Sequence, residues 1–338
     1  MEDTGRVVTW EEWMNEALHA PGAGYYARHI GSVGERGDFS TSATLDRTLA
    51  RGIACWLRAR AALLKPQGRI AVIEVGPGDG ALARGILRAL PWWFRWRVDL
   101  HLVETSDSLR KVQQTTLRGR RVRWHTNMAD ALAQTGGRAL IYSNELVDAF
   151  PCRSFILRAG TWLEIAVAES PSGNIRECES GPGSDVPCGG GAWLSGLREG
   201  QRIEIHQAYQ RWLAEWASLW LKGAMLTVDY GYTVEPPPRL PLSGTLRAYF
   251  RQMRLEGEEM LRRKGRQDLT ADVNFSDLAR WGAALGWVTT DLRPQADWLQ
   301  RWVPGQGGRL ADPVDAGGAF LVLEQRPAAS AQTSSSLP

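Results

Sequence analysis

Residues 70–80 have the sequence IAVIEVGPGDG, in which an apolar run passes directly into a glycine-rich turn. The run at 70–75 predicts a buried strand, and the spacing over 80–90 predicts a helix that ends before Pro91. Glycine suits a backbone that turns sharply beneath a ligand, since it accepts positive φ and close approach. The stretch therefore predicts a strand–loop–helix unit that holds a nucleotide-like ligand at the carboxyl end of the strand.

Apolar strands and amphipathic helices continue to alternate after this unit, a pattern that is typical of βαβ units. Further strands are predicted at 98–103, 122–125, 139–143, 224–229, 287–291 and 319–324. We therefore predict an α/β fold with a Rossmann-like, doubly wound sheet of about seven mostly parallel strands.

Other segments flank or interrupt the alternation. The predicted elements are a helix capped by Thr9, a long helix at 44–64, a hairpin at 152–168 that turns at Ala159-Gly160, and a flexible loop rich in Gly, Pro and Ser at 170–191. The predicted divisions are an N-terminal helical segment 1–66, a core domain 67–326 with insertions at about 151–205 and 231–273, and a disordered tail 327–338. The insertions are expected to form a hairpin and helical region beside the substrate.

The composition excludes several functional classes. The net charge of +3 over 338 residues is too small to indicate nucleic-acid binding. The four cysteines (Cys55, Cys152, Cys178 and Cys188) lie far apart, so neither a metal site nor a disulfide scaffold is expected. No signal peptide, mitochondrial leader or long apolar run is apparent. We therefore expect a cytoplasmic protein without membrane insertion.

An acid at the end of the second predicted strand completes the nucleotide-binding pattern. Glu104 follows VDLHLV, where its carboxylate can accept hydrogen bonds from both hydroxyls of a ribose. Such an acid serves NAD as well as S-adenosylmethionine, so the ligand must be decided by the loop. Gly76, Gly78 and Ala81 satisfy the dinucleotide pattern, which keeps NAD open at this point.

The complete loop favours S-adenosylmethionine. Glu74, Gly76, Gly78 and Gly80 form Glu-x-Gly-x-Gly-x-Gly, the form typical of methyltransferases. Asp79 would lie poorly against a pyrophosphate at a helix N-terminus, whereas a sulfonium or amino group tolerates a negative neighbour. None of the five histidines stands in a motif that would supply a dehydrogenase with a proton donor.

Two further strand ends are assigned to the cofactor. Asn144 directly follows the fourth predicted strand. Asp130 follows the third strand and can accept a hydrogen bond from the adenine amino group. Asp130 could equally be a helix N-cap, and the sequence leaves these two interpretations open.

The chain resembles the MidA-type methyltransferases, a family that includes the mitochondrial complex I assembly methyltransferase. The matching blocks are GYY at 24–26, GDFSTS at 37–42, VIEVGPGDG at 72–80, NELVDAFP at 144–151, DYGY at 229–232, TLRAY at 245–249 and DLTADVNF at 268–275. The resemblance implies a class I methyltransferase fold, S-adenosylmethionine as cofactor, and a protein-arginine acceptor such as a respiratory complex subunit. We also expect a homodimer.

The resemblance and the strand-end positions together nominate residues for the acceptor. A guanidinium must be held by carboxylates that orient it and take up its charge and proton, and Glu145 and Asp148 are the first candidates. In the alternative interpretation, Asn144 and Asp148 only cap the next helix and the Glu145 side chain is solvated. Asp229 is a further catalytic candidate, and Tyr230 a substrate-binding one.

Three more residues, Asp38, Thr41 and Asp268, are assigned to a lid or target channel, although such residues also commonly form turns. The chain departs from the family after Ser42, after Tyr249 and at Asp272, so cofactor binding carries over better than the acceptor does. A small-molecule methyltransferase and a non-catalytic, cofactor-binding assembly factor therefore remain alternatives.

Overall fold

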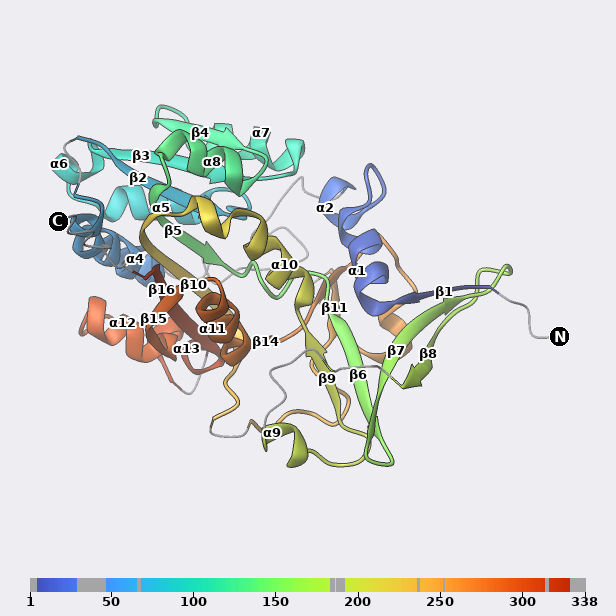
Figure 1. Ribbon diagram of the computed structural model, residues 1–338. Coiled ribbons are helices and arrows are strands. Elements are labelled where there is room, and N and C mark those ends of the chain that lie inside the picture. Colours follow the sequence, from blue (N-terminus) through green and yellow to red (C-terminus); the bar gives the residue numbers. More distant parts are fainter. Residues whose placement is uncertain are drawn as a thin grey trace, which may run out of the picture.

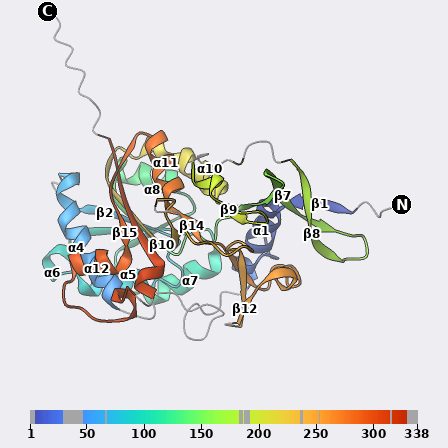
Figure 2. The same ribbon diagram turned by 90° about the horizontal axis from the view of Figure 1, so that it is seen from below.

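The computed structural model describes residues 5–28, 47–65, 68–182, 186, 192–235, 238–251, 253–313 and 316–328. The ribbon shows an α/β lobe with helices on both faces of a large sheet, next to a smaller lobe rich in antiparallel strands (Figure 1). From below, the strands β7 and β8 extend away from the central sheet (Figure 2).

The large sheet has the strand order β15-β16-β10-β5-β2-β3-β4, and the short β14 pairs with β10. Its strands are β2 Ile70–Val75, β3 Val98–Val103, β4 Val122–His125, β5 Arg138–Asn144, β10 Lys222–Tyr232, β14 Val273–Asn274, β15 Trp287–Pro294 and β16 Phe320–Pro327. Of these strands, β16 alone runs in the direction opposite to the others. The predicted α/β, Rossmann-like fold is confirmed.

Helices cover both faces of this sheet because its strands are apolar on both sides. Val72 and Leu140 pack on one face, against α4 (Arg47–Arg60), α5 (Ala81–Ala89) and α12 (Gln295–Trp302). Ile73 and Ile141, their neighbours along the strands, pack on the other face. The helices there are α8 Met128–Thr135, α10 Gln207–Trp216 and α11 Phe275–Ala284. The predicted helix 44–64 is α4 followed by the 3-10 turn Ala61–Leu64 in its described part.

The smaller lobe contains the predicted hairpin. Its strands are β1 Arg6–Thr9, β6 Arg153–Arg158, β7 Thr161–Glu169, β8 Ile175–Pro182 and β9 Arg202–Ile205, all antiparallel. Ala159 and Gly160 form the hairpin turn with φ of 47° and 76°, as this tight connection requires.

The predicted loop 170–191 is wrong over Ile175–Pro182, which is strand β8. Pairing along the free edge of β7 supplies backbone partners that local composition cannot reveal. Glu177 of β8 also accepts hydrogen bonds from the Trp10 indole and the Arg202 guanidinium, which fixes the strand against the lobe.

Helix α1 (Trp10–His19) packs against this lobe. Thr9 accepts a hydrogen bond from the Glu12 amide, and the Glu12 carboxylate accepts one from the Thr9 amide, so the predicted capping box is confirmed. Trp10 and Trp13 are buried in a core shared with β6, β7 and a third sheet. That sheet consists of β11 Arg247–Phe250, β12 Met253–Leu255 and β13 Asp268–Thr270.

Helix α1 and the two expected insertions thus share one hydrophobic core beside the large sheet, whereas α4 of the N-terminal segment packs on that sheet, and the division into domains stays a prediction. The remaining elements are α2 Tyr25–Arg28, α6 Trp92–Arg95, α7 Asp107–Thr116, α9 Ala192–Ser195, α13 Ala316–Ala319 and the 3-10 turns Ala217–Leu219, Gly257–Met260 and Arg309–Ala311. Among the described residues, no helix combines the length and apolarity that crossing a bilayer requires.

Candidate functional site

The turn after β2 has the backbone geometry that its glycines predicted. Gly76, Gly78 and Gly80 have φ of 64°, 54° and 80°, a region that residues with a Cβ rarely adopt. A Cβ on Gly76 would lie 2.7 Å from Cδ1 of Leu146, so the turn also packs closely against the segment that follows β5.

The helix that follows this turn begins with a carboxylate of the chain itself. Oδ1 of Asp79 accepts a hydrogen bond of 2.8 Å from the amide of Ala81, the first residue of α5. A pyrophosphate would compete with this negative charge for the helix N-terminus, whereas the cationic methionyl group of S-adenosylmethionine would not. The turn therefore fits S-adenosylmethionine better than a dinucleotide.

Glu104 lies at the end of β3, buried and held in place. Its Oε1 accepts from the Ser106 amide at 2.8 Å, and its Oε2 accepts from Nε2 of Gln113 at 3.2 Å. Burial raises the pKa of Glu104, and these two hydrogen bonds oppose that shift. A carboxylate positioned in this way is suited to hydrogen-bond the ribose hydroxyls.

Gln113, on α7, is a site residue that the sequence did not nominate. Its Nε2 also donates to the carbonyl of Gly78 at 2.8 Å, and its Oε1 accepts from the Trp124 indole at 3.0 Å. It therefore couples the glycine turn to Glu104. The sequence feature that could have identified Gln113 is its helical spacing with Leu109 and Leu117, which places its amide on the buried face of α7.

We expect Glu104→Gln to weaken S-adenosylmethionine binding about tenfold or more, because hydrogen bonds to a charged group contribute about 1.5–3 kcal/mol. Calorimetric titration with the cofactor measures this effect. Asp107→Asn serves as the control, since this exposed acid belongs to the same segment. An unchanged affinity in Glu104→Gln would remove Glu104 from the cofactor site.

Asn127, not Asp130, is the N-cap of α8, so the capping interpretation of Asp130 is wrong. Oδ1 of Asn127 accepts from the Asp130 amide at 2.8 Å, and Nδ2 of Asn127 donates to the Asp130 carboxylate at 2.9 Å. The Asp130 side chain is exposed, and its contact with adenine stays a prediction.

Glu74 lies inside the sheet, where its β2 position pairs with Tyr142 of β5. It is 2% exposed, and burial raises its pKa to about 8. Its Oε2 is buried and has no hydrogen-bond partner among the described residues. Glu74 is thus a neutral acid at pH 7 that could donate a hydrogen bond beneath the glycine turn.

Asp229 organises the segment that follows β5. Its Oδ2 accepts hydrogen bonds from the amides of Leu146, Val147 and Asp148 at 3.2, 2.9 and 3.3 Å, and its Oδ1 accepts from the Tyr230 amide. The side chain is fully buried. This geometry suits a residue that positions the segment.

The interpretation in which Asn144 and Asp148 merely cap a helix is wrong, because residues 145–150 form turns and no helix follows. Glu145 has φ of 51°, a strained value for a residue with a side chain. Its amide donates to the Val228 carbonyl at 3.0 Å, and its Oε1 accepts from Nδ2 of Asn144 at 3.1 Å. The half-buried Glu145 is therefore held at the carboxyl edge of the sheet.

Asp148 lies deeper than Glu145, at 3% exposure. One carboxyl oxygen accepts a hydrogen bond from the Tyr230 hydroxyl, and Oδ1 has no partner among the described residues. Burial, with the nearby charges of Glu145 and Asp268, raises the pKa of Asp148 to about 8. The guanidinium carbon of Arg247 lies 4.6 Å from the centre of the Tyr230 ring and partly offsets the acidic cluster.

Residues from both lobes meet at this acidic cluster. Oδ1 of Asp268, on β13, accepts from the Tyr26 hydroxyl at 3.0 Å. Burial, together with the charges of Asp268 and Asp148, raises the pKa of Tyr26. The structure therefore brings Glu145, Asp148 and Asp268 together. Asp38 and Thr41, the other two residues assigned to the channel, lie outside the described residues.

Two histidines that belong to no sequence motif support the same segment. The His206 ring hydrogen-bonds the backbone of Asp148, and His19 hydrogen-bonds the backbone of Ala149. Burial lowers the pKa of His206 to about 4, so this ring is a neutral donor. No sequence pattern connects either histidine to residues 145–150. In the described part of the chain, no group of acids, histidines and cysteines forms a metal site.

A family model described as "Putative S-adenosyl-L-methionine-dependent methyltransferase" matches residues 51–292. The Drosophila melanogaster protein arginine methyltransferase NDUFAF7 homolog, mitochondrial, is 27% identical over 301 residues, which cover 78% of this chain and 64% of that protein. The Mus musculus protein arginine methyltransferase NDUFAF7, mitochondrial, is 26% identical over 81% of this chain and 66% of its own length. The chain thus spans slightly less than two thirds of these relatives.

Solved structures show the same relationship. A Burkholderia thailandensis protein bound to S-adenosyl-homocysteine is 25% identical, with a TM-score of 0.77 over 95% of this chain and 88% of that one. A second structure from that organism, 26% identical, has a TM-score of 0.76 over 95% of this chain and 87% of the other. With the family model matching most of its length, the chain belongs to the S-adenosyl-L-methionine-dependent methyltransferase family.

Proposed function

We propose that this enzyme transfers a methyl group from S-adenosylmethionine to an arginine of a protein substrate. The observation that carries the proposal is Oδ1 of Asp148, which lies beside Glu145 at the carboxyl edge of the sheet and has no hydrogen-bond partner within the described ranges. Paired carboxylates suit a guanidinium, which presents several donors and a permanent charge. The relatives named as protein arginine methyltransferases support this acceptor.

Each side chain of the site has a distinct part in this reaction. Bound S-adenosylmethionine supplies an electrophilic methyl group on its sulfonium. Glu104 fixes the ribose, and Gly76 and Gly78 let the backbone approach the cofactor. Glu145 orients the guanidinium, and the ionised Asp148 accepts the proton that the attacking nitrogen loses. Asp229 acts through the backbone, as a positioning residue.

We expect methyl transfer to rise as the pH increases from 7 toward 9. The folded-state pKa of Asp148 is raised to about 8, so the carboxyl is protonated below that pH and can neither pair with a guanidinium nor accept a proton. The rate should fall up to tenfold per pH unit below 8. Initial rates at saturating cofactor measure this profile, and a rate that decreases over the same interval would contradict it.

The raised pKa values of Glu74 and Asp148 also make the stability of the fold depend on pH, and stability should fall where methyl transfer rises. Glu74 and Asp148 have folded-state pKa values raised to about 8, whereas their unfolded values are near 4. The folded state therefore binds more protons between pH 4 and 8, and the free energy of unfolding should decrease as the pH rises through that interval. Urea unfolding at several pH values tests this slope.

Mass spectrometry of methylarginine in proteins from cells with and without the gene tests the acceptor directly. We expect at least one protein to lose a methylated arginine and to regain it when the purified enzyme and cofactor are added. A respiratory complex subunit is the first protein to examine, in view of the resemblance above. Tight cofactor binding without transfer to any protein would favour the scaffold alternative, and transfer to metabolites the small-molecule one.

The compartment and the oligomeric state belong to this proposal as well. We propose a cytoplasmic location, as the sequence suggests, although the relatives above are named mitochondrial. Cell fractionation distinguishes the two. The proposed homodimer is tested by light scattering of the purified chain.

A further inference from the structure

The short helix α6 and its C-cap, Trp96, carry three tryptophans that the methyl-transfer site does not use. Trp92, Trp93 and Trp96 are 69%, 49% and 74% exposed. Between them, Phe94 is buried and anchors the helix in the core of the α/β lobe. Clustered exposed aromatic side chains of this kind mark an interaction surface.

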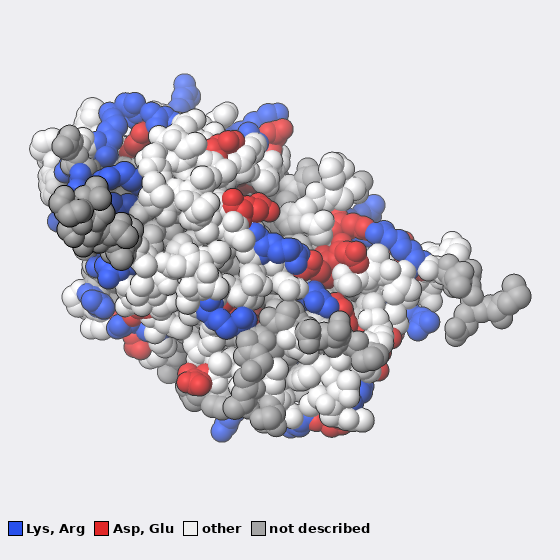
Figure 3. Space-filling model, in the orientation of Figure 1, with Lys and Arg blue, Asp and Glu red and all other residues white. Residues whose placement is uncertain are grey.

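The chain around these indoles is strongly basic. Residues 47–97 contain ten Arg and Lys and only two acids, Glu74 and Asp79. Glu74 is buried in the sheet, and Asp79 binds the start of α5 at the opposite end of β2. Blue atoms predominate at the end of the molecule where Figure 1 places α4 and α6 (Figure 3). This end therefore attracts anions.

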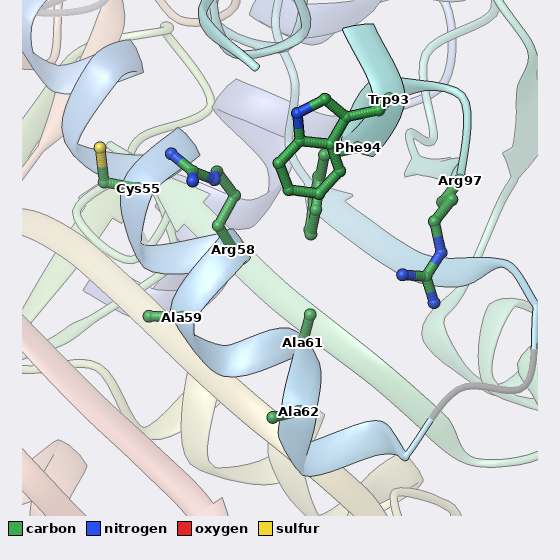
Figure 4. Close-up of a pocket in the computed structure, with 8 residues that line it drawn as sticks. All are labelled: Cys55, Arg58, Ala59, Ala61, Ala62, Trp93, Phe94 and Arg97. Carbon is green, nitrogen blue, oxygen red and sulfur yellow. The ribbon is translucent and has the colours of Figure 1, made fainter. Parts of the chain in front are cut away.

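A pocket of about 620 Å³ lies between the end of α4 and helix α6. Figure 4 shows the Trp93 indole with Arg58 on one side and Arg97 on the other, above a floor of alanines. The guanidinium carbon of Arg58 lies 5.7 Å from the centre of the Trp93 ring. Within the described ranges, neither arginine forms an ion pair with an acid.

This pocket lies at the edge of the sheet opposite to the methyl-transfer site. Its residues come directly before β2 and β3, whereas Gly76 and Glu104 follow those strands. The two parallel strands are six residues long, so the two edges are about 20 Å apart. A partner bound at α6 would leave the site around Asp148 accessible.

We propose that Trp92, Trp93, Trp96, Arg58 and Arg97, the Trp–Arg surface, bind the surface of an anionic phospholipid bilayer. Indoles prefer the interface between headgroups and acyl chains, and basic side chains bind the phosphates beside them. The pocket between Arg58 and Arg97 has the charge to accept a lipid phosphate. A second copy is a poorer occupant, because a symmetric contact would bring these arginines against themselves.

The contact that we infer is peripheral, and it does not depend on the acceptor of the methyl group. Trp92 and Trp96 are more than two thirds exposed, as insertion between headgroups requires. A bound single-stranded nucleic acid would also use aromatic and basic side chains, and the experiment must separate the two.

Co-sedimentation of the full chain with vesicles tests the proposal. We expect binding to vesicles of phosphatidylcholine with 30 mol% phosphatidylglycerol, weakening as salt is raised, and little binding to phosphatidylcholine alone. Trp92→Ser with Trp96→Ser, and separately Arg58→Gln with Arg97→Gln, should each lower the vesicle affinity about tenfold or more. Calorimetry should show the same S-adenosylmethionine affinity in both double variants.

Matched controls remove similar side chains elsewhere. Leu221→Ser with Met253→Ser removes two exposed apolar groups, and Arg254→Gln with Arg262→Gln removes two exposed charges. Both controls should bind vesicles within about twofold of the parent chain. If the tryptophan variant fails to fold, the arginine variant decides the question.

Three outcomes would overturn the proposal. The first is absence of binding to anionic vesicles, or equal binding to phosphatidylcholine alone. The second is binding to poly-uridylate, lost in both double variants, without vesicle binding, which would assign the surface to nucleic acid. The third is a dimer in light scattering that only the double variants abolish, which would assign the Trp–Arg surface to a second copy of the chain.

Discussion

Asp148→Asn is expected to reduce methyl transfer about 100-fold or more while leaving S-adenosylmethionine affinity within about twofold. General-base groups typically contribute 10²–10⁴-fold, and the amide can neither accept a proton nor pair with a guanidinium charge. The fold should tolerate the change, because a carboxyl with a pKa of about 8 is already neutral at pH 7. Single-turnover transfer and calorimetric titration with the cofactor provide the two measurements.

Tyr230→Phe is the informative companion variant. The Tyr230 hydroxyl donates to the Asp148 carboxyl and lowers its pKa, so its removal should move the pH profile of transfer upward. Asp107→Asn, at an exposed acid on α7, is the neutral control. A fully active Asp148→Asn enzyme would contradict the assignment of the acceptor site. If the variant instead loses activity, an unchanged free energy of unfolding would show that the loss does not come from misfolding.

Asp229→Ala is expected to destabilise the fold by at least about 3 kcal/mol and to abolish methyl transfer. The substitution leaves the buried amides of Leu146, Val147 and Asp148 without their common acceptor, and each unsatisfied group costs about 1–3 kcal/mol. Without this anchor, Glu145 and Asp148 lose their positions. Urea unfolding measures the first effect, and the methyl-transfer assay measures the second.

Asp229→Asn separates position from charge, since its amide oxygen can still accept from the same three N–H groups. We expect this variant to be much more stable than Asp229→Ala and to retain measurable transfer. If Asp229→Asn were folded, bound the cofactor and lost transfer as completely as Asp148→Asn, Asp229 would have to be a catalytic residue after all.

The strand pattern and the glycine turn were predictable from the sequence because both depend on local chemistry. Apolar periodicity located the strands of the large sheet except the short β14, and glycine adopts the positive φ of Gly76, Gly78 and Gly80 more readily than any residue with a Cβ. The loop predicted over Ile175–Pro182 was wrong because this segment depends on a distant partner and not on local chemistry. Its strand forms only because β7 offers an edge, and that edge is supplied by tertiary structure.

The contacts of the candidate site came from distant parts of the chain. Gln113 connects Gly78 to Glu104, and the histidines His19 and His206 support residues 145–150 from α1 and from the end of β9. No sequence pattern specifies these partners, because the contacts form only when segments far apart in the chain fold together. Asp229 is an example: its sequence position suggested catalysis, whereas the four amides that donate to it fit a positioning residue, and the catalytic assignment stays a prediction.

The sequence by itself determined the α/β fold, the cofactor turn and the acid at the end of β3, since these depend on residue types within short segments. Tertiary structure alone decided which acids lie together, how deeply they are buried and which of them are protonated. A pKa depends on burial and on charges within a few ångströms, and residues such as Tyr26, Asp148 and Asp268 become neighbours only in the folded protein.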